Sequence, residues 1–80
     1  MHYTIKELAI IAGISTRTLR YYDEINLLKP LGLNKSGYRY YGPIEVDKLQ
    51  QILFYKALEI PLSHISTLVM REEFDALNAL

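Results

Sequence analysis

The chain has 80 residues, half of them hydrophobic, which is enough for one small packed domain with a modest core. It contains no cysteine, which excludes disulfides and thiolate metal sites in this segment and suits a reducing cytoplasm, where we expect the protein to act. No apolar run approaches the roughly 20 residues that span a membrane. We expect no signal peptide, because the sequence starts directly in a capped helix. The sequence offers no activated nucleophile, phosphate-binding loop or carboxylate pair, so we expect neither an enzyme nor a cofactor or metal in this segment.

The formal net charge is zero, which at first argues against a nucleic-acid partner. The charges are nevertheless unevenly distributed. Residues 1–56 hold eight basic and five acidic side chains, a balance of +3, whereas residues 57–80 hold one basic and four acidic, a balance of −3. A mildly basic body followed by an acidic tail permits DNA binding without demonstrating it.

The first predicted helix begins at a capping box in which Thr4 and Glu7 can satisfy each other's free backbone amides. One face of this helix is apolar at helical spacing, through Ile5, Leu8, Ala9 and Ala12. Gly13 suits the left-handed residue that ends a helix, and Ser15 is a good N-cap for the next one. Two capped helices joined by so tight a turn are typical of a helix-turn-helix over residues 1–26, although a plain corner of a helical bundle has the same pattern.

The second predicted helix buries Leu19 and Tyr22, with Thr18 beside them, and ends near Asn26. Its opposite side carries Thr16, Arg17, Arg20, Tyr21 and Glu24. For an isolated amphipathic helix, an ordinary solvated face is the simpler interpretation. The capped helix and tight turn in front of it favour a recognition helix that lies in the major groove of DNA.

Residues 31–41 predict a small β-hairpin, because two short extended runs flank the turn sequence Asn34-Lys35-Ser36-Gly37. Alternation along the second run places Tyr38 and Tyr40 on one face and Arg39 and Tyr41 on the other. A two-stranded hairpin is not stable alone, so it is expected to lie on the helices as a wing.

Residues 43–69 predict a second helical pair. Pro43 is suited to the first position of a helix, and Pro61 separates this helix from the next. The apolar faces of the two helices are Val46, Leu49, Ile52 and Leu53, with Lys56 at the end of that face, and then Leu62, Ile65, Leu68 and Val69. Residues 71–80 are expected to be an acidic linker, followed from Asp75 by the truncated start of a dimerisation helix with Phe74, Leu77 and Leu80 on its apolar side.

The run Ser-x-Arg-Thr-Leu-Arg-Tyr-Tyr-Asp-Glu over residues 15–24 is followed by Leu-Leu-Lys-Pro at 27–30, Gly-Tyr-Arg at 37–39 and Tyr41. In order and spacing these motifs resemble the MerR family of bacterial transcription regulators, over essentially the whole chain. The resemblance implies a mainly α fold: a winged helix-turn-helix with a hairpin wing, then a second helical pair that acts as another wing. The amino-acid sequence of the wing is more similar to that of the multidrug- and antibiotic-responsive branch of the family than to that of the metal sensors.

Site residues carried over from the resemblance lie on three segments. Thr16, Arg17 and Tyr21 match recognition-helix positions that approach base edges and phosphates, and Arg20 matches a position that the family fills with basic residues. Tyr38 and Arg39 match the wing positions that hold the DNA backbone. Lys56 matches a basic residue that contacts phosphate in relatives. With Thr18 these are the candidate DNA-binding residues. The sequence departs from the family pattern at Leu33, where many members carry an arginine, and at Asn26 and Glu59, which replace glycines at helix ends.

The partners that the resemblance implies are double-stranded DNA at a pseudo-palindromic promoter, a second copy of the chain bound through a helix continuing past Leu80, and, indirectly, RNA polymerase. Such dimers distort a promoter whose spacer is too long. Two alternatives stay open at this point: an excisionase-like architectural factor, which shares the winged fold but bends DNA for recombination, and a winged helix that binds only protein. Salt-dependent DNA affinity would exclude the second.

Overall fold

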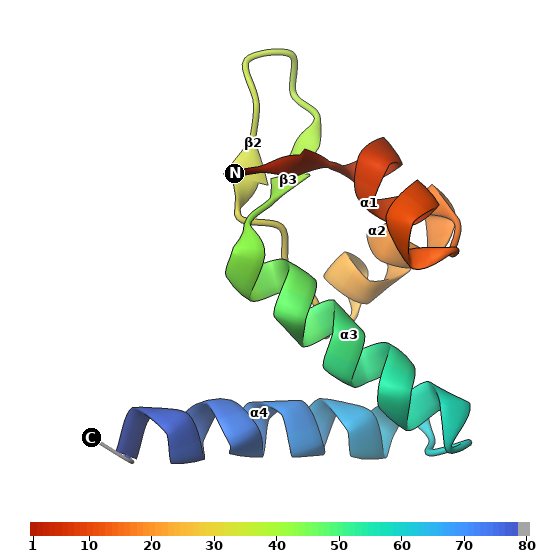
Figure 1. Ribbon diagram of the computed structural model, residues 1–80, viewed down its shortest axis with the longest axis vertical. Coiled ribbons are helices and arrows are strands. Elements are labelled where there is room, and N and C mark those ends of the chain that lie inside the picture. The colour runs from red at the N-terminus through yellow and green to blue at the C-terminus, as the bar shows by residue number, and fades with distance from the viewer. Residues whose placement is uncertain (79–80) are drawn as a thin grey trace. The chain divides into compact units, whose positions relative to one another are not determined.

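A computed structural model describes the backbone of residues 1–78 and the side chains of residues 1–73. The elements, in chain order, are β1 (Tyr3–Thr4), α1 (Ile5–Ala12), α2 (Thr16–Glu24), β2 (Gly32–Leu33), β3 (Arg39–Tyr41), α3 (Pro43–Ala57) and α4 (Leu62–Asn78), as Figure 1 shows. The predicted mainly helical fold with a helix-turn-helix, a hairpin wing and a second helical pair is confirmed. The chain divides into two compact units, a first unit of residues 1–49 and a second of residues 50–80.

The core of the first unit lies where α1, α2 and the sheet meet. It contains both predicted helix faces and one tyrosine from β3; its buried side chains are Ile5, Leu8, Ala9, Leu19, Tyr22, Leu27, Leu28, Tyr41 and Leu49. Burial raises the pKa of Tyr41. The hydroxyls of Tyr22 and Tyr41 find no hydrogen-bond partner in the described part of the chain, so these two rings serve the core as apolar bulk.

The starts of the helices follow the sequence closely. The Thr4 N–H donates to Glu7 Oε1 at 2.9 Å and the Glu7 N–H donates to Thr4 Oγ1 at 3.1 Å, which completes the predicted capping box of α1. Ser15 Oγ accepts the Thr18 N–H at 3.0 Å at the start of α2. Pro43 is the first residue of α3, and the Gly42 N–H donates to Glu45 Oε1 at 2.8 Å.

Helices α1, α2 and α3 end in the same Schellman geometry, in which a left-handed residue closes the last turn with two backbone hydrogen bonds. The left-handed residues are Gly13 (φ 70°), Asn26 (φ 59°) and Glu59 (φ 61°). At the end of α3, for example, the Glu59 N–H donates to the Lys56 carbonyl and the Ile60 N–H to the Tyr55 carbonyl. Asn26 and Glu59 therefore adopt the left-handed backbone conformation that glycine favours. The replacement of glycine at these two positions does not alter the way in which the helices end.

The sheet has three strands in the order β1-β3-β2, all antiparallel, so the wing is joined by an N-terminal strand that the sequence did not indicate. Tyr3 pairs with Tyr41, and Gly32 pairs with Tyr40. The Tyr40 ring stacks on the His2 ring, with 5.1 Å between the ring centroids. It also lies against Gly32, where a Cβ would come within 2.9 Å of the Tyr40 hydroxyl oxygen. Strand β1 therefore anchors the base of the wing to α1, which it directly precedes.

An ion-pair cluster around Asp23 joins the wing to α2. Arg39 Nε donates to Asp23 Oδ2 at 2.9 Å, and Lys29 Nζ lies 2.8 Å from Asp23 Oδ1. The hydrogen bond from Lys29, and then that from Arg39, hold the pKa of Asp23 below its ordinary value of 3.8, against the opposing effect of burial. The last turn of α2 is thus joined to the first residue of β3.

The second unit contains the end of α3 and helix α4, with Ile52, Ile65 and Val69 buried and the Tyr55 hydroxyl donating to Glu72. This hydrogen bond raises the pKa of Tyr55. The predicted acidic linker is wrong: α4 continues without a break through residues 71–73 to Asn78, because nothing in this run breaks a helix. The expected apolar side chains Phe74, Leu77 and Leu80 lie outside the described side chains. No helix within residues 1–78 is both long and apolar enough to cross a bilayer.

Replacing Glu59 with glycine is expected to stabilise the protein by about 0.5–1 kcal/mol. A side chain at φ 61° costs about 1–2 kcal/mol, and the greater freedom of glycine in the unfolded chain offsets part of the gain. The measurement is urea unfolding at pH 7. Glu59→Ala is the matched control, since it removes the same charge but keeps a Cβ, and equal stability of the two variants would contradict the explanation.

The Asp23 cluster is expected to make stability depend on pH below about 4. A depressed carboxyl pKa contributes stability above its unfolded value, and this contribution is lost as the pH falls through the lower folded value. Asp23→Asn should therefore cost about 1 kcal/mol at pH 7 and progressively less toward pH 2. Chemical unfolding of both proteins across this range checks it; a difference that stays constant would exclude the cluster as its source.

Candidate nucleic-acid interface

The outward side of α2 carries the residues expected to meet DNA. Arg17, Arg20 and Tyr21 are exposed, Tyr21 by 48%, whereas the neighbouring Tyr22 is 1% exposed in the core. The spacing 17, 20 and 21 places these three side chains on adjoining turns of one helix face. The helix is held in this orientation because Leu19 and Tyr22 are completely enclosed by the first unit.

The two threonines of α2 are placed differently from each other. Thr16 is half-buried and lines a groove beside the wing. Thr18 is also half-buried, and its Oγ1 lies 2.9 Å from Ser15 Oγ, with which it shares a hydrogen bond. The Thr18 hydroxyl thus belongs to the capping arrangement at the start of α2, which is its structural role alongside the predicted DNA contact.

The wing presents Tyr38 on a turn that is ordered by Asn34. Asn34 Oδ1 accepts the backbone N–H groups of Ser36 and Tyr38, at 2.9 and 3.0 Å, and the Gly37 N–H donates to the Asn34 carbonyl. The Tyr38 side chain is 65% exposed. A fixed backbone with a freely exposed aromatic hydroxyl is suited to holding a phosphate oxygen.

Arg39 is brought to α2 by its hydrogen bond to Asp23. Only its Nε–H is used there, and the guanidinium carries further donors that can bind a phosphate in a second direction. The wing residue therefore combines a structural contact, which the sequence analysis did not foresee, with the predicted DNA contact.

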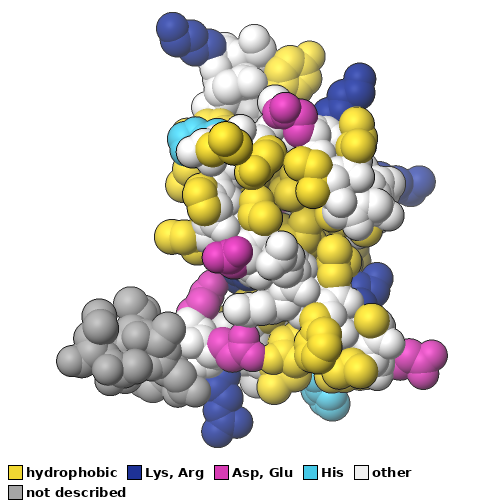
Figure 2. All heavy atoms as spheres, viewed as in Figure 1, with side chains coloured by type: hydrophobic (Ala, Val, Ile, Leu, Met, Phe, Trp, Pro, Cys, Tyr) yellow, Lys and Arg dark blue, Asp and Glu magenta, His cyan; other side chains and the backbone are white. Residues whose placement is uncertain are grey.

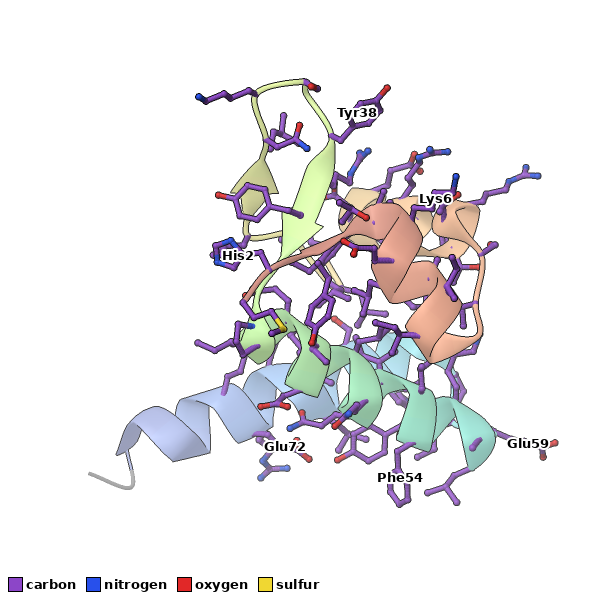
Figure 3. The ribbon with its side chains drawn as sticks, turned by 45° about the horizontal axis from the view of Figure 1, so that its top comes forward. His2, Lys6, Tyr38, Phe54, Glu59 and Glu72 are labelled. Atoms are coloured by element: carbon purple, nitrogen blue, oxygen red, sulfur yellow. The ribbon has the colours of Figure 1, made fainter. Side chains whose placement is uncertain are left out.

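A groove of about 480 Å³ lies between α1, α2 and the wing, and Thr16, Arg20 and Tyr38 all line it. Its lining residues are Thr4, Ile5, Lys6, Thr16, Arg20, Asn34 and Tyr38. Figure 3 shows Lys6 at the start of α1 and Tyr38 on the wing, on the same side of the first unit. Lys6 lines this groove as well, although the sequence analysis did not place it among the candidate positions.

Positive charge in the first unit is available to an external partner. Figure 2 shows Lys and Arg side chains standing out around its edge, over the wing and the helices. Within the described part of the chain, no ion pair engages Lys6, Arg17 or Arg20, whereas Lys29 and Arg39 are paired with Asp23. No group of three His, Cys, Asp or Glu side chains that could hold a metal ion occurs among the described residues.

Lys56 lies in the second unit, exposed in the last turn of α3. A cation there is favourable to the helix itself, because the last turn carries partial negative charge. Its position is compatible with both this local role and the predicted phosphate contact.

Comparison with known proteins identifies the same fold and family. A family model described as MerR HTH family regulatory protein matches residues 3–72. The HTH-type transcriptional regulator SkgA of Caulobacter vibrioides is 46% identical over 78 residues, covering 98% of this chain and 31% of that protein. The chain thus spans about a third of the length of this curated relative, whose name is that of a transcriptional regulator.

Among the similar solved structures, two bear on function. MtaN, the N-terminus of the Bacillus subtilis multidrug transporter activator, superposes with a TM-score of 0.77 and 33% identity, covering 96% of this chain and 83% of that one. HiNmlR, a MerR family regulator lacking the sensor domain and bound to promoter DNA, gives a TM-score of 0.81 and 28% identity, covering 92% of this chain and 56% of that one. The 80-residue chain, with its capped helix-turn-helix, three-stranded wing and following helical pair, belongs to the MerR family of helix-turn-helix regulatory proteins.

Proposed function

We propose that this chain is the DNA-binding part of a transcription regulator, with α2 in the major groove of double-stranded DNA and the wing on the flanking backbone. The observation that carries the proposal is the outward face of α2, where Arg17 and Arg20 lie without carboxylate partners in the described chain, beside an exposed tyrosine. Two like charges without carboxylate partners on one helix face repel each other, whereas they attract a polyanion such as DNA. The promoter-bound HiNmlR structure, which shares the fold, supports the same assignment.

The position and chemistry of each candidate side chain indicate whether it would contact a base or the DNA backbone. Arg17, in the first turn of α2, has the reach and the planar donors to read a guanine edge, since recognition helices contact bases with their N-terminal residues. Tyr21, Tyr38, Arg39 and Lys56 are assigned to the DNA backbone, where they set register without reading sequence. Few base contacts combined with a wing suit a protein whose specificity depends in part on how easily its site deforms.

The regulator is proposed to act in the cytoplasm as a homodimer on a pseudo-palindromic promoter, with distortion of the DNA controlling initiation by RNA polymerase. Residues 1–70 form the DNA-binding domain in this proposal, and α4 leads toward a dimerisation helix. Membership of the MerR family supports this arrangement. The multidrug branch is favoured by the likeness to MtaN, the multidrug transporter activator.

Arg17→Ala is expected to lower affinity for a specific duplex by about tenfold or more and affinity for random duplex by less, because a base contact is worth about 1–3 kcal/mol of discrimination. The specific duplex is selected from a random library with the wild-type chain, and binding is followed by fluorescence anisotropy. Arg71→Ala, which removes the same side chain from α4, is the control and should change neither affinity. Equal losses on both duplexes would assign Arg17 to phosphate.

Arg39→Ala and Asp23→Ala separate the two roles of the wing arginine. Each change removes one partner of the hydrogen bond between the wing and α2, so both should weaken specific binding. Only the loss of the arginine should also lower the slope of log K against log salt, by about 0.9 per bound chain, since only it removes a phosphate contact. Salt titrations of the two variants measure this, and unchanged slopes in both would leave Arg39 with the structural role alone.

A further inference from the structure

We propose that the Asn34 side chain is a positioning group for DNA binding, which fixes the tip of the wing in the conformation from which Tyr38 meets the sugar-phosphate backbone. The proposal rests on the DNA-binding function above and deepens it. It gives a part in binding to a neutral side chain that acts through another residue and was not among the candidate positions.

Asn34 is joined to residues 36–38 through its backbone N–H, its backbone carbonyl and its side chain. The Asn34 N–H donates to the Tyr38 carbonyl at 2.8 Å, and the Asn34 carbonyl accepts the Gly37 N–H at 2.9 Å. Asn34 Oδ1 accepts two further backbone amides, that of Ser36 at 2.9 Å and that of Tyr38 at 3.0 Å. The side chain thus makes half of these contacts, and one of them goes directly to the residue that is proposed to hold DNA.

These hydrogen bonds hold a turn that has no packing of its own. Residues 33–38 are all exposed, and none of them contributes a side chain to the core. The strands that flank the turn are short, since β2 has two residues and β3 has three. Ordering exposed residues costs backbone entropy, and only local hydrogen bonds are present here to offset that cost. The order of the turn therefore depends on the Asn34 acceptor.

The arrangement favours an indirect role for Asn34. Its Oδ1 is an acceptor that already receives two amides, and a phosphate oxygen offers no hydrogen to it. Tyr38, by contrast, is 65% exposed, and within the described chain its hydroxyl makes no hydrogen bond. The backbone of residue 38 is thus fixed while its side chain remains available to a partner. A group that is held in place before binding loses less freedom on binding, which strengthens the complex.

The first measurement concerns the free protein. Solvent exchange of the Ser36 and Tyr38 backbone amides is followed by NMR and compared with the intrinsic rate of each sequence. Asn34→Ala should quicken both by about fivefold, because their acceptor is removed. Asn34→Asp should keep the wild-type rates, since a carboxylate oxygen accepts the same two amides.

The second measurement is binding to the selected duplex and to random duplex, by anisotropy at several salt concentrations. Asn34→Ala should weaken both by about fivefold with an unchanged salt slope, because a backbone contact reads no sequence and no charge is removed. Ser36→Ala is the matched control in the same turn and should bind like the wild type, since the Ser36 hydroxyl makes no hydrogen bond in the described chain. In a Tyr38→Ala background, Asn34→Ala should cost about twofold or less, because the residue through which it acts is gone.

Other outcomes overturn the proposal in distinguishable ways. Equal affinities for Asn34→Ala and Ser36→Ala would remove Asn34 from DNA binding while leaving the proposed function intact. An equal loss with and without the Tyr38 side chain would assign Asn34 a direct contact with DNA instead of a positioning role. Unchanged amide exchange in Asn34→Ala would also exclude positioning. A wild-type chain with no salt-dependent affinity for any duplex would overturn the proposed function itself, whatever the exchange rates of the turn.

Discussion

The carboxylate of Asp23 is the point at which the two parts of the proposed DNA surface are held together. It lies in the last turn of α2 and accepts hydrogen bonds from Lys29, just beyond the helix, and from Arg39, at the start of β3. A recognition helix and a wing must keep a fixed separation if both are to meet the same duplex. In the first unit that separation is set by a short charged contact on one side and by strand β1, which pairs with β3, on the other. The wing is consequently part of the body rather than a free arm.

The ends of the helices supply a second constraint. Three helices close in the same Schellman geometry, although only one of them uses glycine. Asparagine tolerates the left-handed conformation because its short side chain can bond locally, whereas a glutamate there bears the full steric cost. The same pair of backbone hydrogen bonds therefore sets the direction in which the chain leaves each helix. At Glu59 this geometry requires a strained backbone conformation.

Some basic side chains have a role in the fold whether or not they also contact DNA, whereas others occupy positions that are unfavourable to their own helix. Lys56 lies in the last turn of α3, where a cation stabilises the helix, and Lys29 and Arg39 compensate a carboxylate. Lys6 and Arg17 lie in the first turns of α1 and α2, where a cation is unfavourable. In the proposed function, exposed cations such as these serve the DNA anion, and their uneven distribution lets a chain of zero net charge present positive charge on one unit.

The sequence by itself determined the helices, their caps and the outward side of α2, since these depend on residues within one or two turns of each other. It also indicated the turn of the wing, where Asn34 and Gly37 act locally. The third strand, the Asp23–Arg39 contact and the groove shared by Lys6, Arg20 and Tyr38 were decided only by the tertiary structure, because each joins residues at least 14 positions apart through packing that no local pattern encodes. The continuity of α4 was missed for a different reason: an acidic run suggested a linker, but charged residues are good helix formers, and only the backbone geometry shows which tendency prevails.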